Sequence, residues 1–236
     1  MPMEKVTIFT DGAAKGNPGP GGFGAVVSFN NKVVELGEAK NPTTNNEMEL
    51  KAVVESLKFL VNEEITSSEI YTDSKYVVEG ATGWIFGWVK NGWQTKAGTD
   101  VLNKELWQEL VDLLKKVKVD WHKVPGHVGI IGNERADTIA SDLGEGKKVD
   151  LYSGLRSGYG YEIENVEYDK EKELERSAAR KRQSQKAHSY ISKVDGVIEV
   201  HQTWKECEDR VKGKKGVMFK KSLSAEDEKE IIESFK

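Results

Sequence analysis

The sequence predicts an α/β protein in two parts: a mixed five-stranded sheet with flanking helices over residues 1–147, and a small α+β domain over residues 188–236. Up to residue 147, β-branched and aromatic runs alternate with segments whose apolar residues recur at helical spacing. A shorter series of the same kinds of element begins at His188. Between the two parts, scattered glycines and dense charge predict a linker over residues 148–187.

The first part is predicted to begin with three antiparallel strands, because an Asn30-Asn31 turn separates two of its apolar runs. A helix with apolar residues at helical spacing follows, and then strands and helices alternate as in a mixed sheet. Gly144 is placed to end the last helix. The expected strands are 6–10, 24–29, 32–36, 69–72 and 118–124, and the expected helices are 49–60, 74–79, 106–114 and 133–143.

The second part is predicted to have the order β-β-α-β-α. An Asp195-Gly196 turn joins strands 189–194 and 197–200, because such a dipeptide favours a tight hairpin. A helix is expected from Thr203, a strand over 217–220, and a final helix after Ser224. About 50 residues of this kind make a very small domain.

Composition excludes several classes of protein. No apolar run approaches the roughly 20 residues of a membrane-spanning helix, so we expect no membrane partner. The net charge of -4 argues against a protein that coats nucleic acid through a bulk positive field, so any such site must be local. The single cysteine, Cys207, cannot form an internal disulfide, and the first residues lack the features of a secretory signal. We expect a cytoplasmic protein.

Four carboxylates lie at the edges of predicted elements in the first part. Asp11 comes just after the first predicted strand and Asp73 just after the fourth, where open α/β sheets place their sites. Glu49 begins the first long helix, and Asp137 lies in the last one. Four crowded carboxylates would repel each other unless hard divalent cations, above all Mg²⁺, lay between them. For Asp11 before Gly12, a role in a turn is an equal alternative from the sequence alone.

Several segments together resemble the successive signatures of type 1 ribonuclease H, in uninterrupted order from about residue 4 to residue 145. The resemblance implies a ribonuclease H-like fold. It also implies a hydrolase, an endonuclease that cuts the RNA strand of an RNA/DNA hybrid and leaves 5′-phosphate and 3′-hydroxyl ends. The segments are 10–22 (TDGAAKGNPGPGG), 43–50 (TTNNEMEL), 71–74 (YTDS), 125–127 (PGH) and 132–137 (GNERAD).

By the same resemblance, two Mg²⁺ ions, with Mn²⁺ as a substitute, are held by Asp11, Glu49, Asp73 and Asp137. Two such ions stabilise the attacking and the leaving oxygen of an in-line phosphoryl displacement. His127, in a glycine-flanked loop, matches a histidine that assists proton transfer or product release, and a histidine side chain is suited to moving protons near neutral pH.

The resemblance also implies substrate contacts in the first part. Amide side chains can recognise the 2′-hydroxyl that distinguishes RNA from DNA, although asparagine and glycine also simply build turns. The first part departs from the family in two ways. Pro42 lies where relatives often carry arginine, and residues 84–96 contain only two lysines. Both differences predict weaker phosphate binding. Trp107 and Trp121 are expected in the core. The implied contact residues are Gly12, Asn17, Thr44, Asn45, Asn46, Tyr76, Trp84, Trp88 and Asn133.

The second part resembles the hybrid-binding, or viroplasmin-like, domain of eukaryotic-type ribonucleases H, which in those relatives usually precedes the catalytic domain. Tyr190, Trp204 and Phe219 have the family's spacing, and Lys220 and Lys221 follow them. The resemblance implies stacking on sugars and contact with phosphates, on a hybrid or on double-stranded RNA. The alternative is that Trp204 and Phe219 form the core of a small domain. The first hairpin lacks the family's basic residues.

Three other classes of function remain as alternatives. The first is a pure binding protein with this fold and an inactive site, against which the four acids argue. The second is an integrase or junction resolvase, which would lack the asparagine-rich segment 45–49 and the Gly126-His127 pair. The third is a fragment of a reverse transcriptase. The expected enzyme is a monomeric nuclease.

Overall fold

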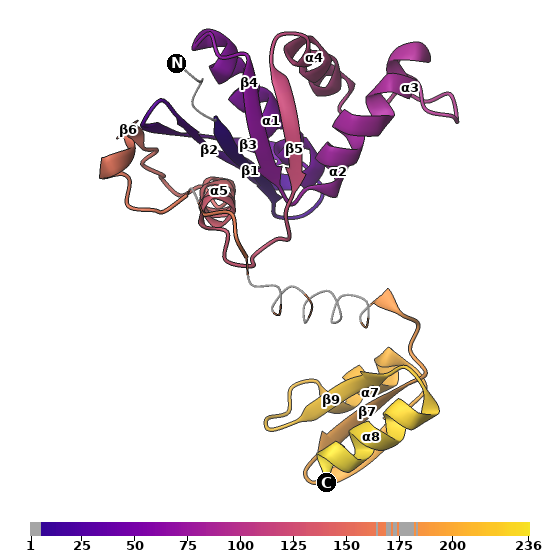
Figure 1. The fold of residues 1–236 in the computed structure, drawn as a ribbon. Coiled ribbons are helices and arrows are strands. Elements are labelled where there is room, and N and C mark those ends of the chain that lie inside the picture. Colours follow the sequence, from indigo (N-terminus) through magenta and orange to yellow (C-terminus); the bar gives the residue numbers. More distant parts are fainter. Residues whose placement is uncertain (1–5, 164, 169–170, 172–173, 175–181, 183) are drawn as a thin grey trace. The chain divides into compact units, whose positions relative to one another are not determined.

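The computed structural model describes residues 6–163, 165–168, 171, 174, 182 and 184–236, and the chain divides into two compact units, Met1–Asp169 and Lys170–Lys236 (Figure 1). No helix in the described part is long and apolar enough to cross a membrane.

The elements of the first unit are β1 (Thr7–Ala14), β2 (Gly19–Phe29), β3 (Lys32–Thr43), α1 (Asn45–Asn62), β4 (Ser67–Thr72), α2 (Lys75–Glu79), a π-helical turn (Gly80–Trp84), α3 (Ile85–Lys90), α4 (Lys104–Leu114), β5 (Lys118–Lys123), α5 (Ile131–Gly144) and β6 (Ser153–Leu155).

These strands form one mixed sheet in the order β5-β4-β1-β2-β3-β6. The β1-β4 and β4-β5 pairs are parallel, and the β1-β2, β2-β3 and β3-β6 pairs are antiparallel. The predicted α/β fold and the three antiparallel strands are therefore confirmed. The sheet has a sixth strand, β6, where five were expected.

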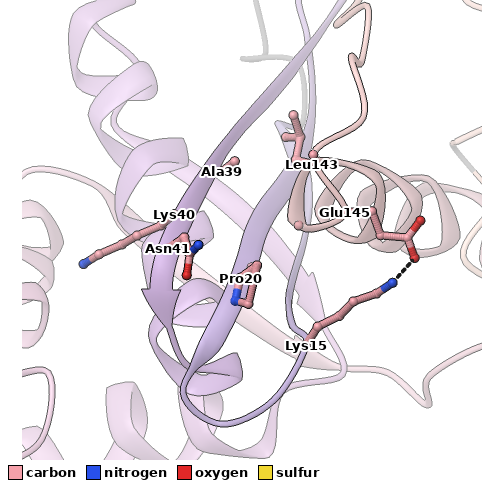
Figure 2. Close-up of a pocket in the computed structure, with 10 residues that line it drawn as sticks. Lys15, Pro20, Ala39, Lys40, Asn41, Leu143 and Glu145 are labelled. Carbon is pink, nitrogen blue, oxygen red and sulfur yellow. Dashed lines mark ion pairs between the residues drawn. The ribbon is translucent and has the colours of Figure 1, made fainter.

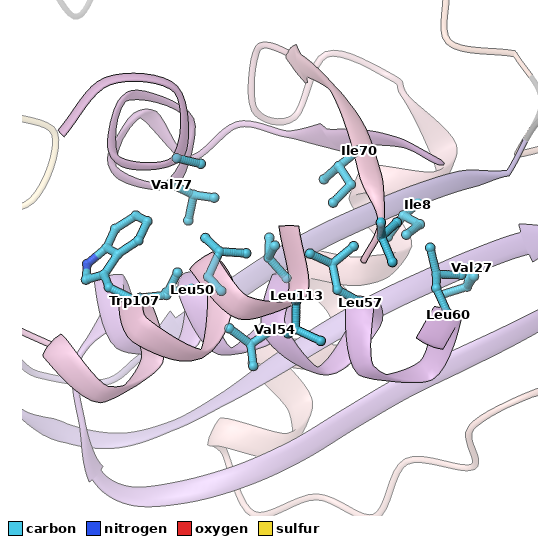
Figure 3. Packing of buried hydrophobic residues seen from close by; sticks show 14 of the residues in the cluster. Ile8, Val27, Leu50, Val54, Leu57, Leu60, Ile70, Val77, Trp107 and Leu113 are labelled. Carbon is cyan, nitrogen blue, oxygen red and sulfur yellow. The ribbon is translucent and has the colours of Figure 1, made fainter. Parts of the chain in front are cut away.

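Two apolar cores cover the two faces of this sheet. Neighbouring residues of β1 point to opposite faces, so Ile8 lies in one core and Phe9 in the other. The first core fills the space between the sheet and helices α1 and α4, as Figure 3 shows for Ile8, Leu57 and Trp107. The second core lies under α5. Trp107 is fully buried and Trp121 packs against the first core, as expected.

The first helix begins where its sequence dictates. The Thr44 hydroxyl accepts a hydrogen bond from the backbone N–H of Glu47 at 3.2 Å, which caps α1. Its apolar residues at helical spacing are buried, because they form the stripe that faces the sheet. The positions predicted for this stripe, Leu50, Val53, Val54, Leu57 and Leu60, are all fully buried.

Strands β1, β2 and β3 are longer than predicted, because glycines that are typical of turns lie inside them. A Cβ on Gly12 of β1 would lie 2.1 Å from the backbone N of Glu49, and a Cβ on Gly24 of β2 would lie 2.1 Å from the carbonyl oxygen of Ala136. Both distances are far below van der Waals contact. These glycines allow α1 and α5 to pack directly on the strand backbones.

The segment predicted as a linker begins on the first unit instead. Residues 153–155 form β6 on the edge of β3, and Tyr159 and Ile163 are buried in the second core. Its aromatic and apolar residues are separated by glycines and charges without a period, so the sequence did not show that they fill one surface. Residues 164, 169–170, 172–173, 175–181 and 183 of the predicted linker lie outside the described residues.

The second unit is a three-stranded antiparallel sheet in the order β8-β7-β9 with two helices, which confirms a small α+β domain. A capping box between Thr203 and Glu206 begins α7, and the Ser224 hydroxyl caps α8. Its described core contains Ile191, Ile231 and Phe235. The elements are β7 (Ser189–Val194), β8 (Val197–His201), α7 (Trp204–Val211), β9 (Met218–Ser222) and α8 (Ala225–Phe235).

Substituting Gly24→Ala tests the close packing of α5 on β2. The added methyl group must push α5 away from the sheet, so we expect the first unit to lose about 3 kcal/mol of unfolding free energy. Urea unfolding followed by tryptophan fluorescence would measure this loss. Gly83→Ala is the control, because a Cβ there meets nothing within 4 Å. A Gly24→Ala midpoint equal to that of the wild type would contradict this account of the packing.

Candidate active site

The other three predicted carboxylates lie around Asp11. Asp11 lies inside β1, not after the strand or in a turn, because β1 continues through Gly12 to Ala14 in register with β2. It is 9% exposed, and one of its carboxylate oxygens accepts a hydrogen bond from the N–H of Gly12 at 2.7 Å. Burial raises the pKa of Asp11 to about 8, with further contributions from the charges of Asp73, Asp137 and Glu49. The structure therefore brings together the strand, the loop and the two helices that carry these acids.

Glu49 is held toward the site by a residue that the sequence analysis missed. The hydroxyl of Ser74 donates to Oε2 of Glu49 at 2.5 Å, and the amide of Asn45 donates to Oε1 at 3.1 Å. Burial raises the pKa of Glu49, the bond from Ser74 opposes that rise, and the charge of Asp73 adds to it. Ser74 also caps α2. The sequence could have indicated this role, because Ser74 directly follows Asp73 and begins a predicted helix.

The loop that carries His127 packs against two of the acids. A Cβ on Gly126 would lie 2.3 Å from Oδ2 of Asp73, so the loop backbone touches that carboxylate. Nδ1 of His127 lies 3.4 Å from Oδ2 of Asp137, and the His127 side chain is 57% exposed. Glu134 of α5, a second residue that the sequence analysis missed, accepts from the N–H of Gly129 in the same loop at 2.9 Å.

The donor set fits a hard divalent cation, because it consists of carboxylate oxygens around one buried acid whose charge needs compensation. Among the described residues, however, no group of three or more His, Cys, Asp and Glu side chains is already arranged to hold a metal ion. The carboxylates therefore define where a cation would be bound, and the side chains would have to adjust around it.

The other predicted contact residues of the first unit fall into two groups. Asn17, Asn45 and Asn46 are exposed, at the β1-β2 turn and at the start of α1, whereas Asn133 is buried on α5 with its Oδ1 unpaired in the described structure. The second group is aromatic: Tyr76 and Trp84 have ring centroids 5.9 Å apart, and Trp84 and Trp88 5.7 Å apart. Trp107 anchors this group by donating to the Tyr76 hydroxyl at 2.8 Å.

The predicted contact residues of the second unit form a row of their own. The ring centroids of Tyr190 and Trp204 lie 5.7 Å apart, and those of Trp204 and Phe219 lie 5.5 Å apart. Trp204 is 41% exposed and Phe219 51% exposed, so they are not the buried core that was the alternative. Lys220 is exposed, and Nζ of Lys221 donates to the carbonyl of Gln185 at 2.8 Å.

A groove of 370 Å³ in the first unit contains none of the predicted site residues. It lies between the strands at Pro20 and Ala39 and the C-terminal turn of α5 (Figure 2). Lys15 and Lys40 line it, but Lys15 is paired with Glu145 at 2.8 Å and Lys40 with Glu47. Its charges are thus paired within the protein.

Substituting Asp11→Asn tests how strongly the carboxylates repel each other without metal. The pKa of Asp11 is higher in the folded than in the unfolded protein. Binding of a proton to Asp11 therefore stabilises the fold fully below about pH 4, and this stabilisation is lost as the pH rises toward 8. We therefore expect the variant to be more stable than the wild type by about 2 kcal/mol or more at pH 8 and equal to it near pH 4. Urea unfolding with a chelator present measures this difference. Exposed Asp120→Asn is the control, and an equal or less stable Asp11→Asn protein at pH 8 would contradict the expectation.

Comparison with known proteins identifies a family that matches the first unit. The model of the RNase H family matches residues 3–145. The ribonuclease H of Bradyrhizobium sp. (strain ORS 278) is 52% identical over 137 residues, covering 58% of this chain and 88% of the relative. That of Erythrobacter litoralis (strain HTCC2594) is 48% identical over 143 residues, covering 61% and 98%.

A solved structure shares the fold as well. The crystal structure of LC9-RNase H1, described as a type 1 RNase H with the type 2 active-site motif, is similar with a TM-score of 0.59 and 28% identity. The match covers 70% of this chain and 84% of that one. Enzymes of this family hydrolyse the RNA of RNA/DNA hybrids and generally depend on divalent metal ions. The family match and the curated relatives show that this chain belongs to the RNase H family and is a ribonuclease H.

Proposed function

We propose that the first unit is a type 1 ribonuclease H that cuts the RNA strand of RNA/DNA hybrids by two-metal-ion hydrolysis, giving 5′-phosphate and 3′-hydroxyl ends. The observation that carries the proposal is the buried Asp11 carboxylate, whose pKa is raised by burial and by three further acids. A site of this kind is costly for the folded protein unless cations are bound there. This argues against a binding protein with an inactive site.

In this proposal Asp11, Glu49, Asp73 and Asp137 hold two Mg²⁺ ions, for which Mn²⁺ can substitute. Bound there, the ions would activate the attacking water and stabilise the leaving oxygen. Ser74 and Asn45 orient the Glu49 carboxylate through their hydrogen bonds. His127, exposed beside Asp137, carries a proton to or from the reacting phosphate or helps the product to leave.

Recognition of the RNA strand is assigned to exposed amides near the acids. Asn17 and Asn46 are free to reach a 2′-hydroxyl in the minor groove, and Asn45 links such a contact to Glu49. The backbone at Gly12 and the side chain of Asn133 are assigned to the same surface. Thr44 is assigned to a phosphate, and the aromatic group of Tyr76, Trp84 and Trp88 to the DNA strand.

We further propose that the second unit is a hybrid-binding domain that tethers the substrate, which can be a hybrid or double-stranded RNA. The row of Tyr190, Trp204 and Phe219 supports this, because partly exposed aromatic rings can stack on sugars and bases. Lysines on β9 and in the turn after α7 are proposed to meet phosphates. They are Lys212, Lys214, Lys215, Lys220 and Lys221.

The enzyme is proposed to act as a cytoplasmic monomer. Its single cysteine, Cys207, is buried and unpaired, which suits a reducing compartment.

Asp73→Asn tests the catalytic assignment. With a uniformly labelled RNA/DNA hybrid in Mg²⁺, we expect the wild type to cut only the RNA strand and the variant to cut neither strand, because one metal ligand is lost. Denaturing gels measure the cleavage, and filter binding should show that the variant still binds the hybrid. Asp120→Asn, an exposed acid on β5, is expected to cut like the wild type. A wild type that binds hybrid but cuts nothing in Mg²⁺ or Mn²⁺ would mean a binding protein.

Trp204→Ala tests the tether. Removing the central ring of the row should raise the KM for a long hybrid several-fold at physiological salt and leave kcat unchanged, because only the local concentration of substrate falls. Steady-state cleavage assays measure both constants. Val197→Ala is the control, since Val197 is 55% exposed in the same unit and does not belong to the row. An unchanged KM for Trp204→Ala would contradict the tether.

A further inference from the structure

The carboxylate of Glu35, on β3, is a buried charge outside the catalytic cluster. Its side chain is 1% exposed, and each of its two carboxylate oxygens accepts hydrogen bonds from two donors. Oε1 accepts from Nε of Arg135 at 2.6 Å and from the hydroxyl of Tyr159 at 2.7 Å. Oε2 accepts from a terminal guanidinium nitrogen of Arg135 at 2.9 Å and from the backbone N–H of Tyr152 at 3.0 Å. A buried carboxylate with four donors is rigidly oriented.

We call Glu35, Arg135 and Tyr159 the carboxylate clamp. Burial alone would raise the pKa of Glu35, but the hydrogen bonds from Arg135 and Tyr159 outweigh that effect and lower it. The carboxyl is therefore ionised in the folded enzyme at neutral pH, and the clamp is a paired set of charges. Removing one partner of such a buried pair is costly, because the remaining charge is uncompensated.

The clamp joins three parts of the first unit that are distant in the sequence. Glu35 belongs to the sheet, Arg135 to α5, and Tyr159 to the segment that follows α5. The backbone of this segment is bonded to β3 through β6, and the N–H of Glu35 donates to the carbonyl of Tyr152 at 2.7 Å. Arg135 also lies over the ring of Tyr161, with 5.5 Å between the guanidinium carbon and the ring centroid. Residues 152–161 therefore contact Arg135 directly through Tyr161 and indirectly through Glu35.

Arg135 lies two residues before Asp137 on α5. Successive residues turn by about 100° around a helix, so the two side chains leave α5 in different directions while sharing its backbone. The same turn of α5 also carries Glu134, which binds the N–H of Gly129 in the His127 loop. A shift of α5 at Arg135 would consequently move Asp137 and the anchor of this loop together.

We propose that the carboxylate clamp positions α5 for the reaction, so that the segment after α5 sets the distance of Asp137 and of the His127 loop from Asp11. Glu35, Arg135 and Tyr159 are positioning residues and do not touch the substrate. The inference rests on the proposed two-metal function of the carboxylates. It assigns a positioning role to Tyr159, which lies beyond the part matched by the family model.

Tyr159→Phe in the full chain tests the clamp, because it removes one donor to Glu35 and keeps the ring. We expect kcat for hybrid cleavage to fall about tenfold with KM within twofold of the wild type, since the geometry of a ligand changes and substrate binding does not. Amide hydrogen exchange over residues 131–138 should accelerate at the same time. Glu35→Gln should lower kcat further, because it also leaves Arg135 without its counter-charge.

Two controls separate positioning from stability. Tyr152→Phe removes a hydroxyl that donates to the carbonyl of Leu155 and not to Glu35, and it keeps the backbone N–H of Tyr152 that donates to Glu35. Leu113→Ala on α4 destabilises the first unit from the opposite core. Both should keep the wild-type kcat at a temperature where they are folded. A Tyr159→Phe enzyme with wild-type kcat and exchange would overturn the clamp alone, whereas a wild type that cuts no hybrid would overturn the proposed function as well.

Discussion

The close approach of two helices to the backbone of the central strands is the constraint on which the rest of this structure depends. At Gly12 the start of α1 lies so near β1 that no side chain fits between them, and at Gly24 the same holds for α5 and β2. Each contact places one acid-bearing helix against the strand pair that contains Asp11. The two glycines thus allow Glu49 and Asp137 to lie close to Asp11.

Such an arrangement works against the stability of the fold. Asp11 loses its water shell and faces other negative charges, so the favourable energy that holds the elements together must come from elsewhere. The two cores on either face of the sheet supply it, with Ile8 and Phe9 anchoring β1 to both. The crowded acids are a local conflict within an otherwise consistent fold, which is typical of functional sites.

The first unit also extends beyond the part of the chain that the family model matches. Residues 148–163 close one edge of the sheet with β6 and add Tyr159 and Ile163 to the core under α5. This segment donates two hydrogen bonds to the buried carboxylate of Glu35 and places the Tyr161 ring against Arg135, so it belongs to the first unit and does not merely connect it to the next. The second unit, in contrast, has a small core and leaves Trp204 and Phe219 partly exposed. An aromatic surface of this kind is costly in such a small domain unless it binds a ligand.

The sequence by itself determined the order of the elements, the apolar faces of the helices and the identity of the four acids. Those features depend on residue type and local spacing, as for the stripe on α1 and the Thr44 cap. Only the tertiary structure decided the length of β2, the sixth strand, the bond from Ser74 to Glu49 and the clamp on Glu35. Each of these features either joins residues that are far apart in the chain or depends on a glycine where two backbones pack closely. Neither kind of contact leaves a periodic pattern of residue types in the sequence. The partners of a buried charge, such as Glu35 and Tyr159, are chosen by the packing of whole elements, because the fold must supply a donor wherever a charge loses water.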